Sequence, residues 1–304
     1  MDSTAAQPGT PRVDPLSGDR SVVVAARQTR PNLPDDGCPF CPGGREAPGP
    51  YDVRWFPNRW PPLPDDRAEV VLYTDDHDAT FASLGVAGAQ RVVDLWAQRS
   101  AELGARPDVH YVLVFENRGP EVGATISHPH GQIYAYDHVP SRAATELARA
   151  RHGDPLARGP AGDDPDGDDP TGVRRLVSVG TGWRAWVPWA ATWPYELLIA
   201  PDEAWPDLPS LDDDARRGLA EVLVDALGRL DALFSAAMPY MLWFHQRPFD
   251  GGDHPDLRVH AHVAPLWRAP QVTRFVAAAE LGGGEFFNPV DPLDAAAALR
   301  ATLP

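Results

Sequence analysis

The order of strands, helices and histidines restricts the fold of this chain more than any other feature. In the first half, apolar strand patterns at residues 68–73 and 110–116 lie on either side of a helical pattern at residues 88–103. An Asn-Arg pair, a glycine-bearing loop and His128-Pro129-His130 follow. A strand, a long helix, a strand and a His-x-His pair in this order indicate an α+β unit with an antiparallel sheet.

The second half of the chain has the same order. Strand patterns at residues 195–200 and 240–245 lie on either side of a helical pattern at residues 211–238, and a loop leads to His260-Ala261-His262. An element Phe-x-(Asn/Gln)-Arg precedes the histidine pair in both halves. This repetition predicts one structural unit used twice, with the two halves sharing one continuous sheet. Chance similarity between buried strands is the alternative.

Each helical pattern has one apolar face, which we expect to be buried. Gly104 follows the first pattern and is placed to end that helix. Ser210 lies three residues before Asp213, so we expect it to cap the second helix. The apolar positions are Ala89, Val92, Val93, Trp96 and Leu103 in the first helix, and Leu219, Val222, Leu223, Ala226, Leu227, Leu230 and Phe234 in the second.

Composition and charge argue against several classes of function. The formal net charge of −16 argues against a long contact with a nucleic acid backbone. The sequence has neither an apolar run of about 18 residues nor a signal-peptide pattern, so we expect no membrane span and a cytoplasmic protein. All basic side chains are arginines, which still suit bidentate phosphate binding.

Two segments have the composition of irregular structure. Residues 1–18 are polar and rich in proline, glycine and aspartate, and we expect a disordered tail there. Residues 151–175 include the acidic run GDDPDGDDPTG, which predicts a linker. The two units therefore span residues 19–150 and 176–304.

The pentapeptide His128-Pro129-His130-Gly131-Gln132 carries the strongest chemical signal. Residues two apart on a strand face the same side, so both imidazoles and the Gln132 amide are directed to one site. Neutral imidazole serves both as a metal ligand and as a nucleophile near pH 7. One histidine can therefore bind a metal ion while the other attacks a substrate.

Cys38 and Cys41 form a C-x-x-C pair that indicates either a metal site or a redox dithiol. A redox pair requires a helix directly after it, whereas Pro42-Gly43-Gly44 follows here and prevents such a helix start. The pattern therefore favours metal. Two further ligands are needed for a closed tetrahedral site, and His77 and His128 are the candidates.

The second half contains three further histidines that suit a metal site. His260 and His262 are again two residues apart on a predicted strand, and His245 ends the preceding strand. The alternative is that these side chains are ordinary hydrogen-bonded core histidines.

The motifs HPHGQ, C-x-x-C and the C-terminal His-x-His resemble the galactose-1-phosphate uridylyltransferases, a branch of the histidine-triad superfamily. The resemblance extends over residues 22–287. It implies an α+β fold in which two histidine-triad-like halves form an antiparallel sheet flanked by helices. It also implies that His77 and His128 complete a zinc site with the two cysteines. Glu146 on a helix would then join His245, His260 and His262 around a second zinc or iron ion.

The resemblance further implies a nucleotidyltransferase that exchanges a UMP group between UDP-glucose and galactose 1-phosphate. His130 would form a uridylyl-histidine, and Gln132 occupies the place of a third histidine in the histidine-triad hydrolases. A glutamine cannot protonate a leaving group, which favours a transferase over a hydrolase. The alternatives are an adenylyltransferase or phosphorylase of the same fold, and a non-catalytic binding module stabilised by metal.

The same resemblance suggests substrate contacts and a homodimer with shared active sites. Three positions differ from the better-known members: Arg59 replaces an aspartate near the ribose, Ala124 a thiol or small polar residue, and Phe286 a glutamine that contacts the hexose. These differences leave the base and the sugar open. The implied substrate-binding residues are Arg27, Arg30, Asn58, Asn117, Gly123, Thr125, Arg274 and Glu280.

Overall fold

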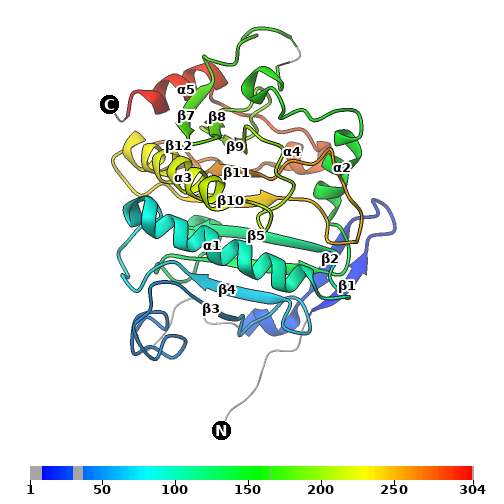
Figure 1. Cartoon of the computed structure of the whole chain (residues 1–304), viewed down its shortest axis with the longest axis vertical. Coiled ribbons are helices and arrows are strands. Elements are labelled where there is room, and N and C mark those ends of the chain that lie inside the picture. Colours follow the sequence, from blue (N-terminus) through cyan, green and yellow to red (C-terminus); the bar gives the residue numbers. More distant parts are fainter. Residues whose placement is uncertain (1–8, 30–36, 165, 303–304) are drawn as a thin grey trace.

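The computed structural model describes residues 9–29, 37–164 and 166–302, and one nine-stranded sheet forms its centre (Figure 1). The strand order is β3-β4-β6-β5-β10-β11-β9-β8-β7, and every neighbouring pair is antiparallel. The two halves of the chain meet at the pair β5 (Tyr111–Arg118) and β10 (Tyr240–His245). This arrangement confirms the predicted α+β fold with an antiparallel sheet.

The repeat predicted from the sequence is visible in the order of strands on either side of the central pair. β6 (His130–Tyr136) lies next to β5, and β11 (His260–Pro265) lies next to β10. The second histidine of the first pair begins β6, whereas the first histidine of the second pair begins β11. The outer strands are β3 (Arg54–Pro57) and β4 (Ala68–Leu72) on one side and β9 (Leu197–Pro201), β8 (Trp183–Trp186) and β7 (Leu176–Gly180) on the other.

Two long helices, α1 (Gly85–Gly104) and α3 (Asp213–Leu233), lie side by side across one face of the sheet (Figure 1). The apolar residues expected to face the core are buried in both helices, apart from Phe234, which follows α3 and is partly buried. Gly104 ends α1 as predicted. The cap of α3 was predicted wrongly: Asp212 accepts from the Ala215 amide, while Ser210 bonds with Asp207 in the preceding turn. A carboxylate one residue from the helix therefore takes the capping role.

Shorter elements surround this framework. They are the hairpins β1 (Thr10–Val13) with β2 (Arg20–Val23) and β12 (Trp267–Ala269) with β13 (Val272–Thr273), the helices α2 (Ser141–Ala150), α4 (Ala278–Gly283) and α5 (Pro292–Arg300), and the 3-10 turns η1 (Ala25–Thr29), η2 (Ala82–Leu84), η3 (Pro120–Val122) and η4 (Gly159–Ala161). The α2 helix carries Glu146, as expected.

Part of the expected disordered tail is ordered. Thr10–Val13 pairs with Arg20–Val23 in a hairpin whose turn is closed by the Gly18 amide donating to the Asp14 carbonyl. Gly18 has a φ of 78°, which glycine adopts without strain. Asp14, Pro15 and Gly18, which were part of the pattern that suggested disorder, lie here in the turn between the two strands.

The acidic segment at residues 151–175 is packed rather than extended. Arg175 is fully buried and donates to Asp163 and to the carbonyls of Val187 and Pro160. Asp163 also accepts from the Trp186 indole. Buried charges that are paired in this way fix the segment against the second half. The division at residues 150 and 176 stays a prediction.

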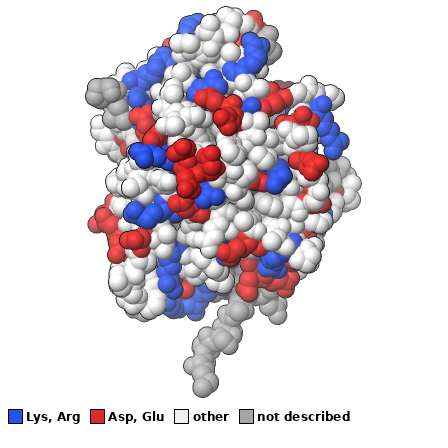
Figure 2. Space-filling view, in the orientation of Figure 1, with Lys and Arg blue, Asp and Glu red and all other residues white. Residues whose placement is uncertain are grey.

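Acidic and basic side chains are interspersed on the face that carries α1 and α3 (Figure 2). Within the part of the chain that the structure describes, no helix combines the length and the apolar character needed to cross a membrane.

Candidate active site

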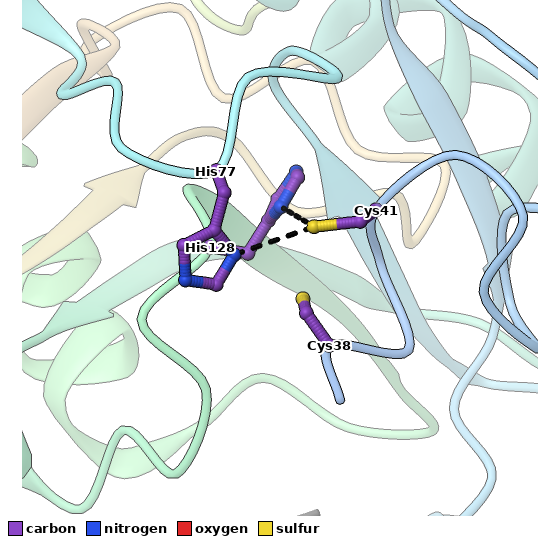
Figure 3. Close-up of side chains that lie close together, drawn as sticks. All are labelled: Cys38, Cys41, His77 and His128. Atoms are coloured by element: carbon purple, nitrogen blue, oxygen red, sulfur yellow. Dashed lines mark hydrogen bonds between the residues drawn. The ribbon is translucent and has the colours of Figure 1, made fainter. Parts of the chain in front are cut away.

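Four predicted ligands, Cys38, Cys41, His77 and His128, converge beside the sheet (Figure 3). The two cysteines come from a tight turn before β3, His77 from the loop after β4, and His128 from the segment that leads into β6. The turn requires glycine at position 44, because a Cβ there would lie within 2.8 Å of three carbonyl oxygens.

The spacing of these ligand atoms fits one tetrahedral metal ion. The Cys41 Sγ lies 3.4 Å from Nδ1 of His77 and 3.7 Å from Nδ1 of His128, and the four ligand atoms are all within 4.8 Å of one another. Zinc bonds of about 2.3 Å to sulfur and about 2.0 Å to nitrogen place tetrahedral ligands about 3.5 Å apart. Burial and the neighbouring Cys38 raise the pKa of Cys41 to about 11, so a cation is needed to hold it as thiolate.

The orientation of His128 is set by contacts at its other nitrogen. Nε2 donates to the Thr74 carbonyl oxygen at 2.7 Å and lies 2.8 Å from the Tyr51 hydroxyl, which itself donates to the Phe40 carbonyl. Nδ1 is thereby turned toward Cys41. Burial lowers the pKa of His128, which favours the neutral ring that binds metal.

His130 begins β6 and lies outside this four-residue group. Its Nδ1 donates to the carbonyl oxygen of His128 at 2.8 Å. With the proton on Nδ1, the lone pair of the neutral ring is on Nε2. The ring packs edge-on against Phe40, with 5.2 Å between ring centroids. These contacts orient His130 as a nucleophile requires.

Gln132 lies two residues along β6 and faces the same side as His130. Its Oε1 accepts from Asn58 Nδ2 at 3.3 Å and from the Tyr134 hydroxyl at 3.2 Å. Both contacts engage the oxygen of the amide, and its nitrogen is the donor end of the side chain.

His130 lines two cavities. The smaller, of about 140 Å³, has apolar side chains that include Phe40 and Phe56 in its wall. Its polar and charged lining residues include Asn58, Gln132, Arg45, Glu46 and Arg59. The larger, of about 340 Å³, also has His130 in its wall together with residues of the loop after β5. A side chain between an apolar pocket and a polar pocket is well placed to attack a ligand that spans both.

The second predicted metal group is also assembled. Glu146 of α2 lies 2.5 Å from Nδ1 of His245 and 3.3 Å from Nε2 of His260. The Nδ1 of His260 donates to the Arg258 carbonyl, which leaves Nε2 directed at the group. Among the described residues neither nitrogen of the buried His262 has a hydrogen-bond partner, as expected of a side chain built to bind an ion.

The electrostatics of this group also fit a cation. Burial opposes ionisation of Glu146, yet hydrogen bonds from His245 and His260 hold its pKa well below the ordinary value. Burial lowers the pKa of His245 and of His262, so both rings are neutral ligands at pH 7. One carboxylate and three imidazoles are a suitable donor set for zinc or iron.

Comparison with known proteins identifies the family. Residues 65–140 match the N-terminal domain of galactose-1-phosphate uridyl transferase, and residues 171–297 match its C-terminal domain. A galactose-1-phosphate uridylyltransferase of Streptomyces lividans is 40% identical over 280 residues, which are 86% of this chain and 79% of the relative. This chain belongs to the galactose-1-phosphate uridyl transferase family.

Solved structures agree with this assignment. A uridylyltransferase structure that is 28% identical superposes with a TM-score of 0.84 and covers 96% of this chain and 98% of that one. An Arabidopsis thaliana ADP-glucose phosphorylase with bound ADP-glucose, 21% identical, has a TM-score of 0.77 and covers 97% and 100%. The latter shares the fold.

In this member of the uridyl transferase family, some of the predicted substrate residues line the two cavities and others do not. Asn58 and Thr125 line the smaller cavity, and Asn117 lines the larger. Gly123 lines neither cavity, and its amide donates to the Pro120 carbonyl within the loop. Arg27 donates twice to the Trp60 carbonyl oxygen at the edge of the site. Arg30 lies outside the described residues.

Arg274 and Glu280 are buried and bonded to each other. Glu280 also accepts from the amides of Ala277 and Phe287, so the pair shapes the segment at residues 274–287. Within a single chain these two side chains hold that segment in shape. Their contact with substrate stays a prediction.

Some residues of the site carry no signal in the sequence. Tyr51 contacts His128, Tyr134 contacts Gln132, and Tyr73 lies behind Gly131, but none belongs to a spaced motif. Tyr51 and Tyr73 meet the site through contacts between segments that are distant in the sequence, whereas Tyr134 lies two residues after Gln132 on β6. Only the strand pattern that contains Tyr73 could have placed it near β6.

Proposed function

We propose that this protein exchanges a UMP group between UDP-glucose and galactose 1-phosphate by double displacement through His130. Nε2 attacks the α-phosphorus of UDP-glucose, the bond from that phosphorus to the bridging oxygen breaks, and glucose 1-phosphate leaves. A phosphate oxygen of galactose 1-phosphate then attacks the same phosphorus, the nitrogen–phosphorus bond breaks, and UDP-galactose leaves. The Nδ1 contact with the His128 carbonyl carries this proposal, because it stabilises the attacking tautomer.

The phosphate oxygens that attack and leave are ionised near pH 7, so neither transfer needs a general acid or base. The site must instead position the reacting groups and offset charge on the phosphoryl oxygens. The Gln132 amide and Asn117, which lines the larger cavity, supply donors for this purpose. The apolar smaller cavity suits the nucleoside, which leaves the larger one for the sugar phosphate.

We assign zinc to Cys38, Cys41, His77 and His128, and zinc or iron to Glu146, His245, His260 and His262. In the first group a bound ion would fix the turn at residues 38–44 against the strand that carries His130. Its contribution is to folding and orientation, because His130 stays outside the ligand set. The second group would tie α2 to β10 and β11 in the same way.

We further propose a homodimer in the cytoplasm in which each subunit completes the other's site. The segment around the buried Arg274–Glu280 pair exposes four large apolar side chains, Phe275, Leu281, Phe286 and Phe287. An apolar surface of this kind is typical of an interface. Sedimentation at micromolar protein concentration tests this, and a monomer would contradict it.

Intact-protein mass measurement tests the reaction. After incubation with UDP-glucose and no acceptor, the chain should gain the mass of one uridylyl group, and galactose 1-phosphate should then remove it. The variant His130→Ala should gain nothing. A gain only from ADP-glucose would favour an adenylyltransferase or phosphorylase, and no gain from any nucleotide sugar would favour a binding module.

A further inference from the structure

A carboxyl group is buried behind the strand that carries the nucleophile. Glu116 is 5% exposed and lies on β5, on the same side as the core residues Val112 and Val114. His130 and Gln132 face the opposite side of the sheet. Glu116 is also among the residues that border the larger cavity, but the proposed transfer gives it no chemical role.

The buried carboxyl group of Glu116 has only one hydrogen bond among the described residues, and no cation is dedicated to it. Its Oε1 accepts from the Tyr240 hydroxyl at 2.9 Å, while Oε2 has no hydrogen-bond partner among the described residues. The nearby cation Arg118 is engaged by Asp231 of α3 at 2.7 Å. Burial raises the pKa of Glu116 to about 7. A carboxyl group held this way is costly to bury unless another contact offsets the cost.

Tyr73 connects this buried group to the nucleophile. Its amide donates to the carbonyl of Pro129, on one side of His130. Its hydroxyl lies directly behind Gly131, on the other side, where an added Cβ would be only 2.1 Å away. The hydroxyl is buried and interacts electrostatically with the Glu116 carboxyl; burial first, and then this carboxyl, raise its pKa. Tyr73 therefore supports both peptides that flank His130.

We propose that Glu116 is a positioning residue for His130. Held by Tyr240 from the second half, it sets the place of Tyr73, and Tyr73 sets the depth of the segment from Pro129 to Gly131. The contact also makes the alignment of the nucleophile depend on the junction of β5 with β10, where the two halves meet. A displacement of about 1 Å at this segment is enough to slow transfer strongly.

The test measures the rate constant for formation of the nucleotidyl-enzyme in a single turnover with radiolabelled UDP-glucose. We expect Glu116→Leu to lower this rate constant roughly 10- to 100-fold while the half-saturating concentration changes by less than about threefold. Glu116→Gln keeps an acceptor for Tyr240 and a donor toward Tyr73, and it should stay within about threefold of the parent.

A purely structural role predicts a different result. Glu116→Leu would then lower the melting temperature and leave the rate constant of the folded enzyme unchanged, which would overturn the inference. Glu69→Gln is the matched control. Glu69 is also a buried carboxylate in this sheet, but it accepts from Arg99 and has no part in the proposed positioning of His130. Its rate constant should equal that of the parent.

A second variant keeps the test decisive if Glu116→Leu does not fold. Tyr240→Phe removes only the hydroxyl that donates to Glu116, and it should still slow labelling about threefold or more. An unchanged rate of labelling in Tyr240→Phe would overturn the inference.

The inference rests on the proposed transfer through His130, and the two can be separated. If the parent chain gains no label, the proposed function fails and the Glu116 assignment falls with it. If the parent is labelled and Glu116→Leu is labelled equally fast, only the Glu116 assignment fails.

Discussion

His130 donates from Nδ1 to the carbonyl oxygen of His128, 2.8 Å away, so the backbone of one metal-ligand candidate orients the side chain of the proposed nucleophile. We therefore propose different roles for the two histidines, although only Pro129 separates them. His128 faces Cys41 through Nδ1, whereas the lone pair of His130 is on Nε2. The proposed metal binding and the proposed nucleophilic attack would therefore be coupled through one short segment.

Removing the imidazole of His130 should abolish transfer without loss of metal. The variant His130→Ala keeps all four ligands of the first metal group, so its zinc content should match the parent. Activity should fall by about 10⁴-fold or more, because no other group can form the covalent intermediate. Exchange assays and elemental analysis measure both, and the exposed His152→Ala is a control. Retained exchange activity in His130→Ala would contradict the mechanism.

Removing one thiol should affect folding more than chemistry. Cys38→Ala deletes one of four ligands, and structural zinc contributes directly to folding. We expect a lower melting temperature and less than one zinc equivalent at this site, with residual activity in the fraction that stays folded. Calorimetry and metal analysis on the same sample test this. Equal zinc content in parent and variant would show that the ligand set is wrong.

Replacing the amide next to the nucleophile should change the fate of the intermediate. The oxygen of Gln132 accepts from Asn58 and Tyr134, so only its N–H donors are left for the proposed phosphate contact. Gln132→His introduces a group that can assist attack by water, as in the histidine-triad hydrolases. Hydrolysis of the nucleotidyl-enzyme without acceptor should rise about tenfold or more. The measurement is loss of radiolabel over time, and an unchanged lifetime would argue against this role.

The framework of this protein was predictable because it depends on local patterns. The strand and helix periods placed α1 and the central strands within about three residues of their observed ends, whereas the pattern for α3 ran on to residue 238, past its end at Leu233. The spacing of Cys38 with Cys41 indicated a metal site. The packing of Arg274 against Glu280 was not predictable, since it depends on how a loop closes. The strand at residues 10–13 was not predicted either, because turns and disordered segments are rich in the same residue types.

The glycine of the HPHGQ motif was recognised in the sequence, but the reason for it was not. Gly131 has to be glycine because the Tyr73 hydroxyl occupies the place of its Cβ, 2.1 Å away. Gly131→Ala should therefore displace His130 and lower activity about 100-fold. Adding Tyr73→Phe removes the nearest atom and should restore part of the activity, although the Phe115 carbonyl oxygen at 3.0 Å and the ring carbon that bore the hydroxyl at 3.1 Å stay in place. A double-mutant cycle on transfer rates measures the coupling, and strict additivity would rule out the contact.

The buried Glu116 should leave a signature in the pH dependence of stability. Its pKa is raised by burial from an ordinary 4.5 to about 7, so between these values the folded chain holds a proton that the unfolded chain releases. The protonated form, which favours folding, is present at low pH and is lost as the pH rises toward 7. Above pH 7 the free energy of unfolding is lower by on the order of 3 kcal/mol for this reason. Glu116→Gln cannot ionise and escapes this cost. Its melting temperature relative to the parent should therefore rise between pH 5 and pH 8, by several degrees. Calorimetry gives the melting temperature of both proteins at each pH, and the difference between them removes the contribution of the histidines, which titrate in both. If the two plots of melting temperature against pH were parallel, Glu116 would have its ordinary pKa.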